Sequence, residues 1–492
     1  AEATLERSPA EVTSPKGVDP RARNVTILTS AAVPWLTGTA SNPILRGVSL
    51  AKLGFNVSFV LPWVVDPAVQ KDLYKGKVFP SRTAQEQVIR SWVKEGSGIN
   101  ISTRGLQLRF YWYDAIMSHP EGSLVSTNPL AELPEDLPRD MLIAEEPDHM
   151  GMFDLSGTCW KGRFKYVVGI MHTNYDAYFE NSGMAFPIRQ TQAEFIDTIL
   201  LQNIDLSIKL SDFPMLRTST HHLLPEAVEN VHGVPTRFFE IGRESWALRT
   251  QPSNRAYFIG KATLAKYSNL LLLAWKAPDF QVDSYGSGAD EKKIAGLARA
   301  IGPKLIGTRM RHHPGMPHTD PTFNKYGVLV NPSTSEVLST VTMEALAMGK
   351  RVVLAQHPTN DFFIKNFPDR VYFYLEDDIR TFMVAYRAAM MLGGPRPLPA
   401  HELPILTWEA ATQRLLNVAL PAGKENFVPS RARLGEPEES CLQLRQYQST
   451  LIRAWRELTW SGGVGSRLPD AGGSGDGAHP HPPLPRATRR AA

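Results

Sequence analysis

The sequence has no apolar run long enough to cross a membrane as a helix. Its most hydrophobic stretch, Leu270 to Trp275, is far shorter than the ~18 residues that such a helix requires. Any contact with a membrane is therefore expected to be peripheral.

Cysteine is also scarce. The two cysteines of the 492-residue chain, Cys159 and Cys441, lie far apart and match neither a disulfide framework nor a zinc-binding spacing. This predicts a reducing compartment. The Gly-x-Ser-x-Gly motif of nucleophilic hydrolases is absent as well, since Gly286-Ser287-Gly288 does not fit it.

The charge balance excludes one class of partner. The formal net charge is +4 and the pI is near 8.9, but no basic cluster is interleaved with aromatic residues, so nucleic acid is not an expected partner. A mild basic bias of this size suits nucleotides or anionic lipids.

What the chain does contain is two series of alternating strands and helices. The strand Val25–Thr29, a glycine-bearing loop, a helix near Asn42–Lys52 and the strand Gly54–Leu61 form the opening βαβ unit of the first series, although the loop lacks GxGxxG. A second series begins at Ala256–Lys261. The predicted fold class is α/β, with two doubly wound Rossmann-like domains facing a cleft.

The predicted boundaries follow this pattern. Residues 1–23 are polar and aperiodic and are expected to be a disordered lead-in, and the Gly/Pro-rich residues 461–492 a disordered tail. Between them we predict a first domain at 24–236, a linker at 237–250, a second domain at 251–405, and helices at 406–460 that cross back to the first domain.

The most informative stretch runs from Asn331 to Gly349. A short buried strand precedes it, and an apolar helix follows that Gly349 can end in the left-handed conformation. This places Glu336 in the loop after the strand and Glu344 on the helix, while the backbone of Ser339 and Thr340 offers an anion seat at the helix start.

Such an arrangement suits a sugar nucleotide. The diphosphate would lie on the helix start, and the two carboxylates would accept hydrogen bonds from the ribose and the sugar. Taken alone, the two glutamates fit equally a solvated pair in which Glu344 merely favours the helix dipole. The neighbouring motifs favour the ligand.

Two lysines follow the first strand of the second series. Gly260 lets a ligand approach the backbone, and Lys261 and Lys266 supply the positive charge that a departing diphosphate requires. The alternative is an ordinary solvated pair of lysines.

Histidines raise two further hypotheses. His172 directly follows the apolar strand Tyr166–Met171, where its imidazole could contact the sugar beside the reacting carbon, or could be a structural residue. The segment from His312 to Asp320 resembles a metal site in composition, but it is broken by proline and lacks ligands at helical spacing. We therefore expect no metal.

Seven stretches together resemble one family, the digalactosyldiacylglycerol synthases of plants and algae, which are retaining two-domain (GT-B) glycosyltransferases of the Glu-x7-Glu type. The resemblance spans about residues 24–420. It is carried by Val25–Thr39, Glu145–His149, His172–Tyr175, Val231–Val234, Tyr285–Gly288, Asn331–Lys350 and Leu406–Thr412.

This resemblance implies transfer of galactose from UDP-galactose to monogalactosyldiacylglycerol, giving digalactosyldiacylglycerol, by a peripheral enzyme of the chloroplast envelope, expected at its outer membrane. By the family pattern Glu336 would hold the donor sugar and Glu344 the ribose. The remaining roles would fall to His172 near the reacting carbon, Lys261 and Lys266 at the diphosphate, and Gly38 and Thr39 in a loop that approaches donor and acceptor. No cofactor is implied.

Two alternatives to this function stay open at this point. One keeps the fold with another hexose donor or acceptor, and the other is a catalytically silent lipid-binding homologue. For the membrane, the segment from Lys71 to Phe79, with Trp63 before it, combines cations and aromatic residues suited to anionic lipid headgroups, or it is an ordinary solvated loop.

Overall fold

The protein was analysed as a computed structural model, which describes residues 24–35, 37–97, 105–113, 136–153, 159–174, 177, 185–213, 218, 221–248, 252–301 and 309–420. The predicted lead-in at 1–23 and the tail at 461–492 lie outside these residues. So do Cys441 and the part of the predicted crossing helices beyond residue 420.

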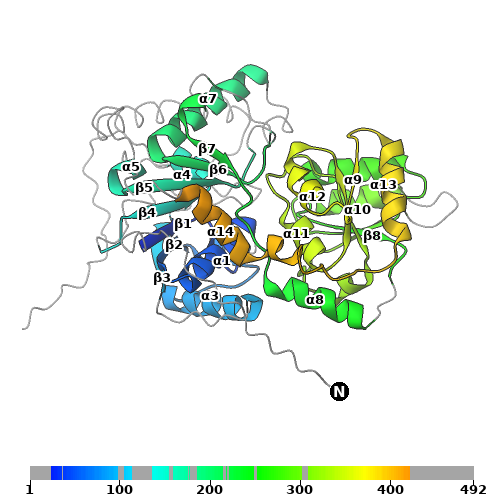
Figure 1. Cartoon of the computed structure of the whole chain (residues 1–492), viewed down its shortest axis with the longest axis horizontal. Helices are drawn as coiled ribbons and strands as arrows, with labels where there is room; N and C mark the ends of the chain where they lie inside the picture. The colour runs from blue at the N-terminus through cyan, green and yellow to red at the C-terminus, as the bar shows by residue number, and fades with distance from the viewer. Residues whose placement is uncertain are drawn as a thin grey trace, which may run out of the picture. The chain divides into compact units, whose positions relative to one another are not determined.

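The first half of the chain forms a seven-stranded parallel sheet in the order β3-β2-β1-β4-β5-β6-β7 (Figure 1). The strand order reverses between β1 and β4, and in such sheets ligands bind at the carboxyl ends of the strands beside this switch point. The strands are β1 (Asn24–Leu28), β2 (Asn56–Val64), β3 (Leu106–Tyr113), β4 (Met141–Glu145), β5 (Tyr166–Met171), β6 (Leu206–Lys209) and β7 (Glu226–Val228).

Helices surround this sheet because its central strands are apolar on both faces. Gly169 of β5 shows how closely they pack, since a Cβ there would lie 2.7 Å from Pro147 and 2.8 Å from Ile204. The described helices of this half are α1 (Gly38–Lys52), α2 (Pro67–Leu73), α3 (Arg82–Ser97), α4 (Pro147–Phe153), α5 (Trp160–Arg163) and α7 (Phe186–Asn203).

The second half forms a six-stranded parallel sheet in the order β10-β9-β8-β11-β12-β13, with its switch point between β8 and β11. The two doubly wound sheets confirm the predicted fold class. The strands are β8 (Ala256–Ile259), β9 (Val282–Tyr285), β10 (Met310–His313), β11 (Val328–Asn331), β12 (Arg351–Ala355) and β13 (Val371–Tyr374).

Two separate groups of apolar side chains cover the faces of this sheet. The helices α9 (Leu264–Lys276), α10 (Glu291–Ala300) and α13 (Ile379–Met391) contribute to one core. The helices α8 (Thr236–Ala247), α11 (Thr340–Ala347) and α12 (Asp361–Asn366) contribute to the other. Short 3-10 turns fill the connections, namely η2 (His221–Leu223), η3 (Pro321–Lys325), η4 (Pro358–Asn360) and η5 (Leu403–Leu406).

Two segments connect the halves. The chain from Val231 to Pro235 leads into α8, so most of the predicted linker is a helix, and α8 packs against α11, with the Cβ position of Gly242 only 2.9 Å from the carbonyl carbon of Met348. The last described helix, α14 (Trp408–Ala419), packs against α1 of the first half (Figure 1).

The structure corrects the interpretation of the cysteines. Cys159 is disulfide-bonded, although the sequence spacing predicted no disulfide. A pattern search fails here because bridges between cysteines that are distant in sequence leave no local signature.

The proposed membrane aromatics also need correction. Trp63, Tyr74 and Phe79 are 9%, 2% and 9% exposed and pack together in a small core of their own. The cations Lys71, Lys75 and Lys77 of that segment are exposed, together with Asp72, Gly76 and Val78. Among the helices that the structure describes, none has the length and apolar character to span a membrane.

Candidate active site

Hydrogen bonds among three polar side chains link the two ends of the loop between β11 and α11. The Asn331 Nδ2 donates to Ser339 Oγ at 2.8 Å and to Thr342 Oγ1 at 3.3 Å. The Ser339 Oγ in turn accepts a hydrogen bond from the Thr342 backbone N–H and caps α11. Ser339 and Thr340 therefore stand at the helix start, as predicted, and Gly349 ends this segment with φ +77°.

Glu336 lies in this loop and faces a lysine of α9. The Lys266 Nζ is 3.1 Å from Glu336 Oε1, and the two side chains are 34% and 26% exposed. The Asn269 Nδ2, one turn along α9, donates to the Pro332 carbonyl and fastens the loop to the same helix. Two predicted site residues from the two sides of the switch point thus come together, with their polar ends still reachable from solvent.

Glu344 projects from α11 and is paired with a residue that sequence reasoning did not select. The His318 Nδ1 lies 2.5 Å from Glu344 Oε2, and the Glu344 side chain is 12% exposed. Burial lowers the pKa of the His318 imidazole, but the charge of Glu344 and the hydrogen bond to it outweigh burial and raise this pKa above its usual value. The protonated form of His318 is therefore favoured beside Glu344.

The loops that follow β8, β9 and β10 are fastened to one another at the same edge. Gly260 N donates to Tyr285 O, and Gly286 N donates to His313 O. A Cβ on Gly286 would lie 2.1 Å from the Gly260 carbonyl oxygen, so only glycine allows this approach. Lys261 follows directly and its side chain is exposed at this edge.

In the first half, His172 directly follows β5, and a carboxylate at the end of the neighbouring strand β4 contacts its ring. Its Nε2 is 2.5 Å from Glu145 Oε2, at the end of β4, and the His172 side chain is 4% exposed. Within the described part of the chain, His172 forms its hydrogen bond with Glu145 and not with a residue predicted to bind the sugar donor. The signal that could have identified Glu145 is its place at the end of a central strand beside the switch point.

Gly38 and Thr39 are the first two residues of α1 and not part of the preceding loop. The Thr29 Oγ1 donates to the Thr39 carbonyl, and the hydroxyls of Thr37 and Thr39 are 2.8 Å apart. These contacts tie the start of α1 to the end of β1. Gly38 is exposed there.

The histidines of the segment from His312 to Asp320 contact other side chains. His312 lies in β10, and its Nδ1 is 3.0 Å from Ser284 Oγ. His318 lies beyond this strand and pairs with Glu344. Among the described residues, no group of three His, Cys, Asp or Glu side chains is arranged to hold a metal ion.

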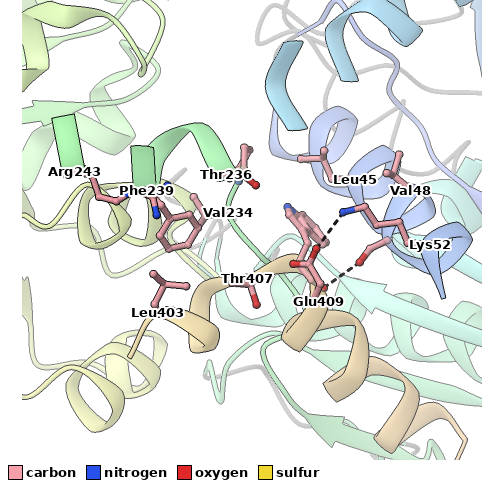
Figure 2. Close-up of a pocket in the computed structure, with 13 residues that line it drawn as sticks. Leu45, Val48, Lys52, Val234, Thr236, Phe239, Arg243, Leu403, Thr407 and Glu409 are labelled. Carbon is pink, nitrogen blue, oxygen red and sulfur yellow. Dashed lines mark hydrogen bonds and ion pairs between the residues drawn. The ribbon is translucent and has the colours of Figure 1, made fainter. Parts of the chain in front are cut away.

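A small pocket lies elsewhere, between α1, α8 and the segment that enters α14 (Figure 2). Its volume is about 130 Å³ and it is lined by apolar side chains such as Leu45, Phe239 and Trp408, with the Lys52–Glu409 ion pair at 3.2 Å on one side. It contains none of the predicted site residues.

Comparison with known folds gives distant matches. Sucrose-phosphate synthase from Thermosynechococcus elongatus is 14% identical, covers 88% of this chain and 99% of its own, and superposes with a TM-score of 0.48. The lipopolysaccharide glycosyltransferase WaaG is 10% identical with a TM-score of 0.47, over 86% and 99%. No family model matches the sequence.

Curated sequences give much nearer relatives. Digalactosyldiacylglycerol synthase 2, chloroplastic, of Arabidopsis thaliana is 35% identical over 415 residues, 81% of each chain, and its Glycine max counterpart is 34% identical over 80% of this chain and 83% of its own. Digalactosyldiacylglycerol synthase 1 of Arabidopsis thaliana is 33% identical over 80% of this chain and 47% of its own. With this identity over four fifths of its length, the chain belongs to the digalactosyldiacylglycerol synthase family of glycosyltransferases.

Proposed function

We propose that this protein transfers galactose from UDP-galactose to monogalactosyldiacylglycerol and so forms digalactosyldiacylglycerol. The observation that carries the proposal is the pair of carboxylates around α11, each held by a basic side chain from another loop or helix. Glu336 is held by Lys266 and Glu344 by His318. The family relationship supplies the substrate class.

Each donor group has a counterpart at the strand ends. The start of α11 at Ser339 and Thr340 suits the diphosphate, because helix N-termini attract anions. Glu344 is assigned to the ribose and Glu336 to the sugar hydroxyls, since ionised carboxylates accept strong hydrogen bonds from hydroxyl groups. Lys261 and Lys266 are assigned to the phosphates, and Gly260, Gly38 and Thr39 to positions where donor or acceptor approaches the backbone.

The reaction that fits these groups is a front-face substitution with retention. The bond between the anomeric carbon and the diphosphate oxygen breaks, and its electron pair leaves with UDP. The acceptor hydroxyl oxygen bonds to the anomeric carbon on the same face, and its proton passes to a phosphate oxygen of the leaving group. Lys261 and Lys266 are assigned to stabilise the growing phosphate charge, and His172 to contact the sugar beside the reacting carbon.

A contact between the two halves supports such an assembled site. The Ser211 hydroxyl, after β6, donates to the Val337 carbonyl next to Glu336. Ser211 and Val337 are 4% and 3% exposed. This contact joins a strand end of the first sheet to the donor loop of the second.

We propose that the protein acts at the surface of a chloroplast envelope membrane, because the acceptor is a diacyl lipid and each CH₂ moved out of a bilayer costs ~0.8 kcal/mol. The curated relatives are named chloroplastic. We assign peripheral attachment to the outer membrane, with anionic lipids as partners of the exposed lysines.

The phosphates can be neutralised by lysines and a helix start, so we propose that no metal cofactor takes part. Galactosyl transfer should then persist at full rate in EDTA. Loss of transfer in the chelator, restored by a divalent cation, would overturn this part of the proposal.

The whole function is tested by offering radiolabelled UDP-galactose or UDP-glucose to the purified protein with monogalactosyldiacylglycerol in mixed micelles. We expect labelled digalactosyldiacylglycerol from UDP-galactose. Transfer from UDP-glucose alone would reassign the donor, and the absence of both transfer and donor hydrolysis would indicate a lipid-binding protein without activity.

A further inference from the structure

A buried ion pair lies beneath His172. Glu145 and Arg46 are both 0% exposed, and the Arg46 Nε donates to Glu145 Oε1 at 2.7 Å. The second carboxylate oxygen, Oε2, is the atom that faces His172 Nε2 at 2.5 Å. Glu145 therefore divides its two oxygens between an arginine of α1 and the histidine that follows β5, and it has no exposed surface with which to contact a substrate.

The ionisation of Glu145 decides which nitrogen of His172 carries a proton. Burial raises the pKa of the Glu145 carboxyl, but the charges of Arg46 and His172 and their hydrogen bonds outweigh it, so this pKa lies below its usual value. An ionised carboxylate can only accept hydrogen bonds. The His172 Nε2 must then carry a hydrogen, which leaves Nδ1 as the ring nitrogen that Glu145 does not hold.

The same pair is tied to the segment that connects the two halves. The Arg46 Nη1 donates to the Val231 carbonyl at 2.6 Å, and the guanidinium lies 5.7 Å from the centre of the Trp408 ring. The His232 ring packs against the His172 ring with 5.0 Å between centroids. Both connecting segments therefore contact this arrangement, one through Val231 and His232 and the other through Trp408.

These connecting segments hold each other closely. A Cβ on Gly233 would lie 2.6 Å from the Trp408 backbone, and Val234 N donates to the Leu406 carbonyl at 2.8 Å. Burial, followed by the charges of His172 and Arg46, lowers the pKa of His232 well below its usual value, so His232 packs as a neutral ring.

We propose that Glu145 is a positioning residue for glycosyl transfer, which holds the His172 ring in one orientation with Nε2 protonated and, through Arg46, anchors it to the backbone at Val231. This inference rests on the proposed function, in which His172 contacts the donor sugar. Its consequence is that Glu145 acts on the rate only through His172.

The test is a double-mutant cycle of Glu145→Gln and His172→Ala, with kcat and the donor KM measured for galactosyl transfer. We expect Glu145→Gln to lower kcat roughly tenfold to hundredfold and to leave the donor KM within about threefold, as for other residues that orient a reacting group. In the His172→Ala background the same change should cost less than about twofold. Equal losses in both backgrounds, or an unchanged kcat, would overturn the proposal.

Loss of a buried carboxylate could act through stability alone, so a matched control is needed. Glu402→Gln removes a carboxylate of similar burial, 6% exposed and 3.0 Å from Arg370, in a different part of the chain. We expect it to lower the melting temperature without changing kcat. If Glu145→Gln does not fold, the double replacement Arg46→Gln with Glu145→Gln removes both buried charges and is compared with His172→Ala in the same way.

A second readout separates this inference from the proposed function. In protein labelled with ¹⁵N-histidine, we expect a hydrogen-bonded, slowly exchanging Nε2–H resonance that disappears in His172→Ala and shifts in Glu145→Gln. Its absence from the parent protein would overturn the positioning role even if transfer is observed. Its presence without any galactosyl transfer would instead leave the positioning geometry standing and reject the proposed reaction.

Discussion

Both glutamates of the donor loop are oriented before any ligand binds. Glu336 accepts from Lys266, and Glu344 pairs with His318, so neither carboxylate has to be ordered at the moment of binding. A carboxylate has two oxygens that accept hydrogen bonds, so each glutamate can also accept one from a ligand hydroxyl. Such orientation reduces the entropy cost of binding, which favours affinity for the donor.

Replacing Glu344 by Gln keeps the shape of the side chain but removes its charge. Because charge-assisted hydrogen bonds contribute about 1.5–3 kcal/mol, we expect the donor KM to rise roughly tenfold to hundredfold. Glu409→Gln, which removes an exposed carboxylate paired with Lys52, serves as the control and should leave the KM unchanged. An unchanged KM in Glu344→Gln as well would remove this residue from the site.

Asp148 in α4 is a buried acid, and its pKa predicts how the stability of the protein depends on pH. Burial and then repulsion from Glu146 raise the pKa of its carboxyl to about 7. The folded state then holds a proton that the unfolded state, with a pKa near 3.9, has released, so the free energy of unfolding should fall as the pH rises from about 4 to about 7.

Asp148→Asn should abolish that part of the pH dependence. At pH 8 the variant should be more stable than the parent by up to about 4 kcal/mol, because three pKa units correspond to that free energy, while at pH 4 the two should be similar. Urea unfolding at both pH values measures this. The same pH slope in parent and variant would show that Asp148 is not the group that titrates.

At the scale of elements, the close approach of the loops after β8 and β9 depends on glycine. In Gly286→Ala the new Cβ would lie 2.1 Å from the Gly260 carbonyl oxygen and 2.5 Å from the Tyr267 hydroxyl. We expect a loss of about 1–3 kcal/mol in the free energy of unfolding and a higher donor KM, since Gly260 and Lys261 would be displaced.

The matched control is Gly296→Ala in α10, where a Cβ would meet nothing within 4 Å. Alanine favours a helix over glycine, so this variant should gain about 0.5–1 kcal/mol with an unchanged KM. Thermal unfolding and donor titrations of the two variants give the comparison. A harmless Gly286→Ala would mean that the two loops are not held as closely as described.

Much of the element pattern could be predicted from the sequence, for a physical reason. Buried parallel strands appear as short apolar runs in the sequence, and β5 begins and ends where its predicted run does. The edge strand β7 and the strand β10, with its two histidines, were not predicted, because polar residues interrupt their hydrophobic pattern. The helix α8 was likewise taken for a linker.

At the scale of the whole molecule, the sequence indicates which polar residues are candidates for a site, but it does not show which of them contact one another. The placement of Glu336 in the loop and of Glu344 on the helix could be predicted because both follow one strand. Their partners lie 70 and 26 positions away, and Glu145 lies 99 positions from Arg46. Contacts of this kind arise from strand order, which no local pattern encodes. The disulfide of Cys159 was missed for the same reason.

The last prediction concerns the lysines that remain exposed after Trp63, Tyr74 and Phe79 are found to be buried. Lys71, Lys75 and Lys77 flank the end of α2, and Val78 beside them is 47% exposed. Lysines near an anionic membrane contribute about 1 kcal/mol each. Replacing all three by Ala should therefore lower the affinity for anionic liposomes roughly a hundredfold and weaken the salt dependence of binding, as measured by sedimentation with the liposomes.

A variant with the same loss of charge tests whether position matters. Lys276, Lys292 and Lys293 are exposed on α9 and α10 of the second half, so their replacement by Ala lowers the net charge equally. If the segment around α2 meets the membrane, this control should bind liposomes nearly as the parent does. Hydrolysis of UDP-galactose without lipid should be unchanged in both variants, because neither set includes a donor-site residue. Equal liposome binding by both triple variants and the parent would contradict attachment through this segment, and an equal loss in both would show attraction by net charge alone.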